Sequence, residues 1–298
     1  MKVVCFDIGG TNVKYGLLDG DGNILDKNKF KTNINNGQDI LYNMCDVVKN
    51  YIALYHIDGI SISSPGFVDT EKGIITDGTI LEGFIGLNIR DYFESRFNIK
   101  TAVDNDANCA TIAEHKIGNG KECKNLVCIT IGTGIGGGIV INNEIYNGSK
   151  FMAGEFGFMF IDGLGKDDPG EKTYSNLAST RGLVERVSKK LNEDISGEEI
   201  FKRASESDNA CLEEIEFFYD KLAMGIYNLA YILNPDKILL GGAISTQEVI
   251  TDEVKLRLDK YTSVSKSLNE YVEIDRCKFL NDAGLIGALC NFVNKYDS

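Results

Sequence analysis

The sequence predicts an α/β protein with two similar domains, and three observations support this fold class. Segments rich in aliphatic and β-branched residues alternate with segments whose apolar residues recur every three to four positions, as strands and helices do in α/β proteins. A strand, a glycine turn and a second strand occur in this order at the start of the chain and again near residue 132. The 298 residues, of which 43% are hydrophobic, suffice for two domains with separate cores.

Apolar runs and their spacing place the individual elements. The predicted strands are residues 3–8, 59–64, 100–103, 126–131, 136–141 and 237–240. The predicted helices are residues 89–97, 107–117, 209–233 and 283–289. The longest helix has an apolar stripe from Leu212 to Leu233, and Asn234-Pro235 ends it. Residues 149–171 combine glycines, a proline and an acidic cluster, which predicts an irregular loop over a cleft.

The first glycine turn has the residues of a phosphate site. Gly9 and Gly10 follow the first strand, and because they lack side chains, backbone N–H groups can approach phosphate oxygens there. Asp7 would face a phosphate-bound Mg²⁺, Thr11 would face the phosphates, and Lys14 would offset phosphate charge. The alternative interpretation is an ordinary hairpin turn with Lys14 as a surface residue.

Two further glycine turns favour the phosphate interpretation. The second, Gly132-Thr133-Gly134, also follows a predicted strand and repeats the first arrangement. The third contains Gly241 and Gly242, where small residues would let an adenosine lie against the backbone. Three such turns in one chain predict a nucleotide site.

The segment Asp104-Asn105-Asp106-Ala107-Asn108, which follows a predicted strand and begins a predicted helix, is the best candidate for chemistry. Asp106 could accept a proton from a hydroxyl group, and Asn105 could bind neighbouring hydroxyls. The alternative is that Asp104 or Asp106 only caps the helix. A second candidate is Glu155, whose position between glycines and apolar residues suggests contact with a polar ligand; a solvated loop residue is the alternative.

Composition argues against several classes of function. A net charge of −13 disfavours nucleic acid as a partner, because binding the phosphate backbone needs clustered Lys and Arg. No apolar run approaches the ~20 residues that span a bilayer, and a strand stands where a signal peptide would be. We therefore expect a cytoplasmic protein. The eight cysteines form no C-x-x-C pair and only two histidines are present, which predicts core thiols and no structural zinc.

Together these motifs resemble the ROK family (repressor, open reading frame, kinase) of sugar kinases, within the hexokinase, actin and heat-shock ATPase superfamily. The resemblance extends over nearly the whole chain and includes the three glycine turns, the Pro65-Gly66 turn, the 104–108 segment, a sugar motif at 153–157 and the helix at 283–288. It implies two ribonuclease-H-like domains flanking an interdomain cleft. Residues 1–117 and 281–298 would form the smaller domain, and residues 118–280 the larger.

The resemblance also implies a role for each candidate residue. Asp106 would be the catalytic base that deprotonates the 6-hydroxyl of a sugar, and Asp7 would hold Mg²⁺ through water. The residues implied to bind the sugar are Pro65, Gly66, Asn105, Asp106, Glu155, Phe158 and Ser175. Those implied to bind ATP are Asp7, Gly9, Gly10, Thr11, Asn12, Lys14, Gly132, Thr133, Gly134, Gly241 and Gly242. Relatives of this kind suggest a homodimer.

Three departures from the family pattern predict the substrate. Many members carry a Cys-rich zinc loop after the sugar motif, whereas residues 162–172 contain no Cys, so we expect no zinc. Phe158 stands where the family has a His that contacts the sugar, and Ser175 where it has an acidic residue. Losing both hydroxyl partners weakens recognition of a free anomeric hydroxyl, and an aromatic ring beside a short side chain leaves room for a substituent on O1. The same aromatic-for-His exchange is typical of the family's β-glucoside kinases.

The sequence therefore predicts ATP-dependent phosphorylation of the 6-hydroxyl of the non-reducing glucose in a cellobiose-like β-glucoside. A zinc-free glucokinase or N-acetylmannosamine kinase of the same family is the alternative, although such relatives keep the His and the acidic residue. A family repressor would need a helix-turn-helix before the first glycine turn, and Asp7 lies too near the start for one. A non-catalytic sugar-binding sensor is disfavoured because Asp7, Thr11, Asp106 and Glu155 are retained.

Overall fold

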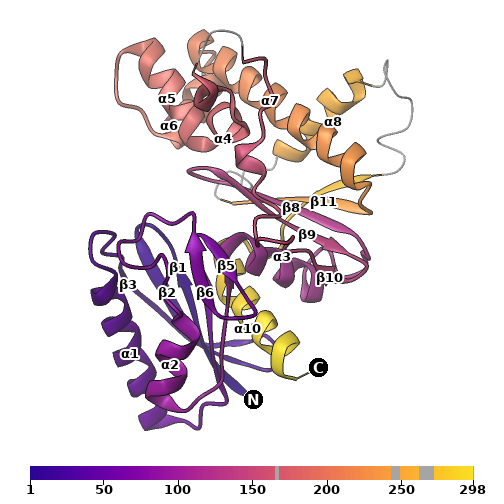
Figure 1. Cartoon of the computed structure of the whole chain (residues 1–298). Helices are drawn as coiled ribbons and strands as arrows, with labels where there is room; N and C mark the ends of the chain where they lie inside the picture. Colours follow the sequence, from indigo (N-terminus) through magenta and orange to yellow (C-terminus); the bar gives the residue numbers. More distant parts are fainter. Residues whose placement is uncertain (165–167, 243–248, 262–271, 298) are drawn as a thin grey trace. The chain divides into compact units, whose positions relative to one another are not determined.

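The computed structural model describes residues 1–164, 168–242, 249–261 and 272–297. Contacts divide it into two compact units (Figure 1). The first comprises Met1–Lys121, Ile145–Ala153 and Asn281–Ser298, and the second comprises Glu122–Glu144 and Gly154–Leu280. This division differs from the predicted boundaries, because Ile145–Ala153 belongs to the first unit. A hydrogen bond of 3.0 Å from the Asn108 side-chain amide to that of Asn147 ties this segment there.

The first unit contains a five-stranded sheet with the order β3-β2-β1-β4-β7. Its strands are β1 (Lys2–Ile8), β2 (Asn12–Asp19), β3 (Ile24–Lys31), β4 (Gly59–Ser64) and β7 (Thr101–Asn105). The central strand β1 pairs antiparallel with β2 and parallel with β4. A separate hairpin of β5 (Phe67–Asp69) and β6 (Ile74–Asp77) follows β4.

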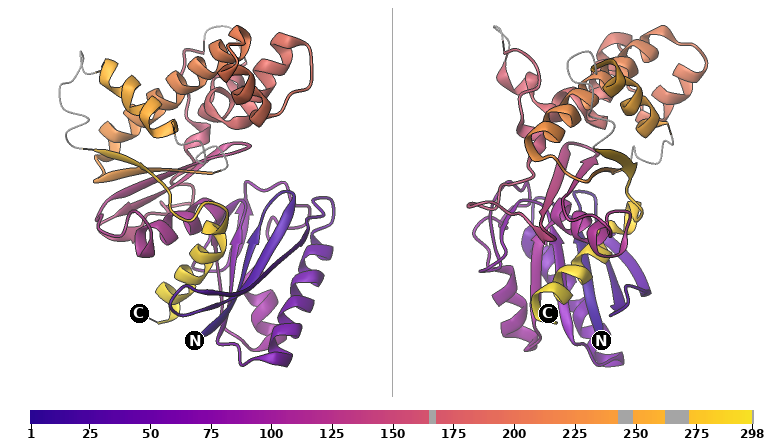
Figure 2. Two further views of the ribbon diagram at one scale, coloured as in Figure 1. Left: turned by 180° about the vertical axis from the view of Figure 1, so that it is seen from behind. Right: turned by 90° about the vertical axis from the view of Figure 1, so that its right-hand side faces the viewer.

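Helices lie on both faces of this sheet (Figures 1 and 2). On one face, α1 (Gly37–Leu54) and α2 (Ile89–Phe97) share a core with Val4, Phe6 and Ile8 of β1. The alternate residues Val3 and Cys5 point to the other face, where α10 (Ala283–Tyr296) packs on the sheet and against α3 (Asp106–Ile117). Burial on both faces explains why β1 is almost continuously apolar.

The second unit repeats this topology with the strand order β10-β9-β8-β11-β12. Its central strand β8 (Leu126–Ile131) pairs antiparallel with β9 (Ile135–Ile141) and parallel with β11 (Lys237–Gly241), as β1 does with β2 and β4. The outer strands are β10 (Glu144–Ile145) and β12 (Glu273–Arg276). The repeat confirms the prediction of two similar α/β domains, each with a glycine turn between its first two strands.

The helices of the second unit are α4 (Tyr174–Ala178), α5 (Thr180–Leu191), α6 (Gly197–Ser205), α7 (Asn209–Leu233) and α8 (Ile250–Lys260). The bounds of α7 match the predicted helix, and Asn234, in the left-handed conformation with φ of 43°, caps its end. One part of its predicted apolar stripe is wrong: Leu212 is exposed, because the first turn of α7 presents Cys211 and Ile215 to the core instead.

Two other predictions concern irregular structure and cysteines. Residues 149–171 are irregular apart from 3₁₀ turns at Phe156–Phe158 and Pro169–Lys172, and residues 165–167 of that segment lie outside the described residues. All eight cysteines are buried thiols, as expected of core residues. Among the helices that the structure describes, none has both the length and the apolar character needed to cross a membrane.

Candidate active site

The junction between β7 and α3 carries the Asp104–Asn108 segment. Asn105 is the residue that caps α3: its side-chain oxygen accepts the N–H groups of Ala107 at 2.8 Å and Asn108 at 3.1 Å. The N-cap is therefore neither Asp104 nor Asp106, although the Asp106 carboxylate also accepts the Ala107 N–H at 2.8 Å. The Asn105 amide nitrogen also donates to the Gly66 carbonyl at 2.9 Å, so this side chain joins the Pro65-Gly66 turn to the junction.

Asp104 and Asp106 differ in exposure, although both carboxyl groups have a raised pKa. Burial raises the pKa of Asp104 to about 6, and its carboxylate accepts hydrogen bonds from the Asn105 N–H and the Asn108 side chain. Desolvation, followed by the negative charge of Asp7, raises the pKa of Asp106 to about 6. Asp106 is nevertheless exposed, unlike the buried Asp104. Asp104 fixes the junction, whereas Asp106 can reach a ligand.

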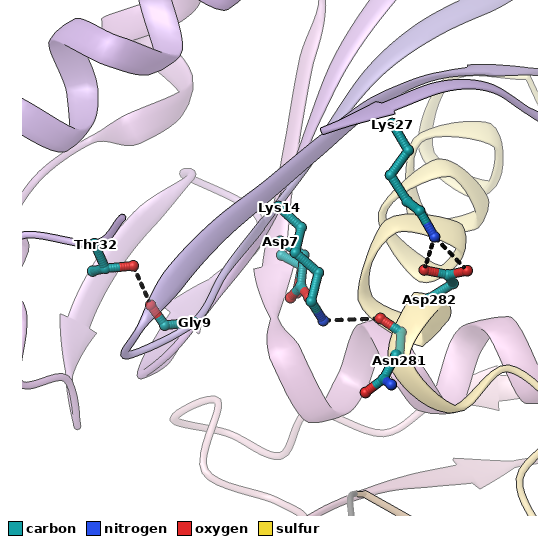
Figure 3. A network of polar contacts seen from close by, with 8 residues as sticks. Asp7, Gly9, Lys14, Lys27, Thr32, Asn281 and Asp282 are labelled. Atoms are coloured by element: carbon teal, nitrogen blue, oxygen red, sulfur yellow. Dashed lines mark hydrogen bonds and ion pairs between the residues drawn. The ribbon is translucent and has the colours of Figure 1, made fainter. Parts of the chain in front are cut away.

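The first glycine turn offers backbone donors. The Gly9 N–H closes the turn on the Asn12 carbonyl at 3.0 Å, and the Thr32 hydroxyl donates to the Gly9 carbonyl at 2.6 Å (Figure 3). Gly10 and Thr11 are exposed, and their N–H groups have no hydrogen-bond partner among the described residues. The turn therefore presents two adjacent donors that an anion can occupy.

Asp7, at the end of β1, is held by two neighbours. Ser63 of β4 donates to one carboxylate oxygen at 3.0 Å, and Lys14 of β2 contacts the other at 3.2 Å. The Lys14 ammonium also donates to the Asn281 carbonyl at 2.8 Å, just before α10 (Figure 3). Lys14 is thus more than the surface residue of the alternative interpretation. A Cβ on Gly284 of α10 would lie 2.3 Å from the Asp7 carboxylate, so glycine is required there.

The second glycine turn lies in the second unit and depends on Ser175. The Ser175 hydroxyl accepts the Ile135 N–H at 2.9 Å, and the Thr180 N–H donates to the Gly132 carbonyl at 3.0 Å. The N–H groups of Thr133 and Gly134 have no partner among the described residues, which repeats the arrangement of the first turn. Ser175 therefore supports the phosphate turn, a role that the sequence interpretation, which gave it only to the sugar, did not include.

The third glycine turn is close-packed on its own sheet. A Cβ on Gly242, where φ is +89°, would lie 2.2 Å from the Ile131 carbonyl, and one on Gly241 would lie 2.9 Å from the Cys277 sulfur. Packing against β8 and Cys277 is thus sufficient reason for both glycines. Contact with adenosine at this turn remains a prediction.

The sugar motif packs on β9 through its glycines. A Cβ on Gly154 would lie 2.5 Å from the Gly137 carbonyl, and one on Gly157 would lie 2.3 Å from the Ile135 carbonyl. This packing places Glu155 just before the 3₁₀ turn and Phe158 at its end. The Phe158 side chain is 65% exposed, so an aromatic ring is presented where the family pattern has a His.

Sequence reasoning missed two residues that organise these sites. Ser63 reaches Asp7 because β4 pairs in parallel with β1 in a register that places the two residues side by side. Asn147 reaches Asn108 from a segment far along the chain. A serine in a buried strand and an asparagine in a loop give no local signal, so the strand register and the tertiary fold were needed to find them.

The donor set fits Mg²⁺ that is bound to phosphate. Mg²⁺ keeps several waters and commonly takes one or two protein carboxylates together with substrate phosphates. Asp7 supplies such a carboxylate, 15% exposed and fixed by Ser63, on the strand that leads into the first glycine turn. No cluster of three or more His, Cys, Asp or Glu side chains suited to a metal occurs within the described part of the chain.

Comparisons with known proteins cover the whole chain. The ROK family model matches residues 3–294. A beta-glucoside kinase of Listeria monocytogenes is 35% identical over 300 residues, which cover 99% of this chain and 98% of the relative.

Several solved structures are also similar. One from Listeria monocytogenes, for which an N-acetylmannosamine kinase activity has been suggested, has a TM-score of 0.92 at 33% identity and covers 99% of both chains. A ROK family protein of Streptococcus pneumoniae in complex with sucrose has a TM-score of 0.90 at 30% identity, with 100% and 99% coverage. A glucokinase of Streptomyces griseus in complex with glucose and AMPPNP has a TM-score of 0.83 at 25% identity, with 97% and 98% coverage.

Proposed function

Because the chain belongs to the ROK family and is a carbohydrate phosphotransferase, we propose that it transfers the γ-phosphoryl group of ATP to the 6-hydroxyl of the non-reducing glucose of a cellobiose-like β-glucoside. Its fold is the actin/hexokinase-like α/β fold of ROK sugar kinases. The observation that carries the proposal is the sugar motif, where Phe158 presents an exposed ring in place of a His.

The side chain of Ser175 and its hydrogen bond support the same substrate. Its hydroxyl oxygen accepts the Ile135 N–H, and no carboxylate stands at this position to accept a hydrogen bond from a free anomeric hydroxyl. A substituent on O1 removes the anomeric donor that would otherwise lack a partner. The relative named beta-glucoside kinase agrees with this choice.

In the proposed reaction, the 6-hydroxyl loses its proton to the Asp106 carboxylate as its oxygen forms the bond to the γ-phosphorus. The bond to the bridging oxygen breaks and ADP leaves. The N–H groups of Gly10, Thr11, Thr133 and Gly134 would bind phosphate oxygens, and Asp7 would hold the phosphate-bound Mg²⁺. When bound, Mg²⁺ neutralises the charge on the phosphates. We expect the enzyme to act as a homodimer and without zinc.

An N-acetylmannosamine kinase or a glucokinase is the second candidate, favoured by the solved neighbour with suggested N-acetylmannosamine kinase activity. A coupled assay of ADP release with MgATP distinguishes the candidates. Cellobiose, gentiobiose, glucose and N-acetylmannosamine are compared at equal concentration, with and without a chelator that binds zinc and spares Mg²⁺. Turnover of the disaccharides above both monosaccharides supports the proposal, and a preference for a monosaccharide rejects it. If no sugar is phosphorylated, a sugar-binding sensor becomes the better hypothesis.

The pH dependence of kcat/KM should reflect the protonation of the Asp106 carboxyl group. The raised pKa of about 6 means that protonation removes the base at a higher pH than for an ordinary Asp. We expect kcat/KM to rise with pH through about 6 and then to level. A pH profile of initial rates checks this, with ADP release followed by chromatography so that coupling enzymes do not limit the rate. A profile that stays flat from about pH 5 to pH 8 contradicts the assignment.

Phe158→His should shift the preference toward free glucose. A ring nitrogen there can pair with a sugar hydroxyl, whereas the stacking surface for a substituent shrinks. We expect the ratio of kcat/KM for glucose to that for cellobiose to rise about tenfold. Phe158→Tyr, which keeps the ring, is the matched control. An unchanged ratio in Phe158→His would show that another residue sets the specificity.

A further inference from the structure

The first unit contains a cavity of about 930 Å³ that none of the predicted site residues lines. One wall is the β5–β6 hairpin, with Phe67, Asp69 and Asp77, and the other is the segment Ile145–Met152. Cavities of roughly 300–1,000 Å³ are typical of small-molecule sites. The cavity is therefore large enough for a ring-sized ligand, and it lies entirely within one unit.

Two of its lining residues connect the cavity to the junction between β7 and α3. Asn147 accepts the hydrogen bond from Asn108, four residues after Asp104 in the same capped turn. Phe67 follows Gly66, whose carbonyl accepts the Asn105 side chain at 2.9 Å. The Asn108 side-chain oxygen is buried and has no hydrogen-bond partner among the described residues, so an acceptor beside Asn147 is unsatisfied. The cavity wall therefore adjoins residues that lie on either side of Asp106 in the chain.

The lining combines aromatic surface with both kinds of hydrogen-bonding group. Tyr146 is 49% exposed and Phe151 is half-buried, which leaves flat apolar surface accessible. Lys72 and Lys150 supply donors, and Asp77 supplies an acceptor. A pyranose ring presents apolar C–H faces with hydroxyl edges that donate and accept, which matches this set. Mixed charges favour a neutral polyol over an anion.

The backbone of the second wall is constrained at Phe151. Its φ is +58°, a left-handed conformation that is rare for a bulky residue. Such conformations concentrate where a side chain must be directed to a ligand. On the opposite wall, the Thr76 hydroxyl donates to the Phe67 carbonyl at 3.0 Å and fixes the hairpin.

We propose that this cavity binds the second sugar ring of a disaccharide β-glucoside, with Tyr146 and Phe151 as stacking surfaces, while the glucosyl ring lies at Asp106. This proposal rests on the proposed function. It states where the second sugar ring binds, which the replacement of His by Phe158 does not indicate. The cavity would recognise the substituent on O1.

The test compares three substrates: cellobiose, methyl β-glucoside, which lacks the second ring, and glucose. In Tyr146→Ala and Phe151→Ala we expect kcat/KM for cellobiose to fall about tenfold, as loss of an aromatic contact does. Values for the other two substrates should stay within about twofold, as is usual for an exposed site away from the chemistry. Tyr146→Phe, which keeps the ring, should match the parent protein on all three.

The outcomes separate the cavity from the proposed function. Equal losses on all three substrates, or no loss on any, overturn the cavity as a second-ring site. If the parent protein phosphorylates methyl β-glucoside but not cellobiose, the cavity proposal fails and β-glucoside kinase activity stands. If the parent uses neither glucoside, the proposed function fails, and the cavity proposal fails with it.

Discussion

Asp106→Asn is expected to lower kcat for sugar phosphorylation by about 10²–10⁴-fold, because an amide cannot accept the proton of the 6-hydroxyl. Folding should be little affected, since the cap of α3 is Asn105 and the buried carboxylate of the junction is Asp104. The measurements are initial rates with MgATP and the best sugar, nucleotide binding by calorimetry, and the melting temperature. The rise in rate with pH near 6 should also disappear in this variant.

A surface carboxylate provides the control for Asp106→Asn. Asp21→Asn makes the same chemical change at an exposed position after β2 and should keep the parent rate. If Asp106→Asn retains activity within about tenfold of the parent, Asp106 is not the base. If it loses nucleotide binding or stability to the same extent, its role is structural.

Gly287→Ala should destabilise the protein strongly, although alanine normally favours a helix interior over glycine by about 1 kcal/mol. A Cβ on Gly287 of α10 would lie 1.9 Å from the Cys109 carbonyl of α3, a backbone atom that has little freedom to move. Overpacking of this kind costs about 1–3 kcal/mol, occasionally more. We expect the melting temperature to fall by about 5–10 °C. Activity should fall as well, because α3 begins with Asp106.

The matched control for Gly287→Ala is Gly163→Ala. An added Cβ at Gly163 meets no atom within 4 Å, so the melting temperature should stay close to that of the parent. Scanning calorimetry at one scan rate suits both variants, because a chain with two units need not unfold in one step. A Gly287→Ala protein as stable as the parent would show that α3 and α10 can separate at little cost.

Local patterns predicted most of the elements. The helices Ile89–Phe97 and Asn209–Leu233 and the strands Gly59–Ser64 and Leu126–Ile131 have the predicted bounds, because periodicity and terminal residues act within a few positions. The capping residue at the β7–α3 junction was missed because local patterns do not distinguish between neighbouring candidates. Three polar residues in succession can each cap a helix, and the partner of each side chain decides among them.

The sequence alone established the repeated strand-turn-strand plan, the ROK family and the candidate base, because glycine turns and motif order are properties of the chain itself. The tertiary structure decided which partners those residues have. Ser63 beside Asp7, Ser175 under the second glycine turn and Asn147 beside Asn108 are contacts between segments distant in sequence. Such contacts depend on strand register and helix packing, which a one-dimensional pattern does not encode.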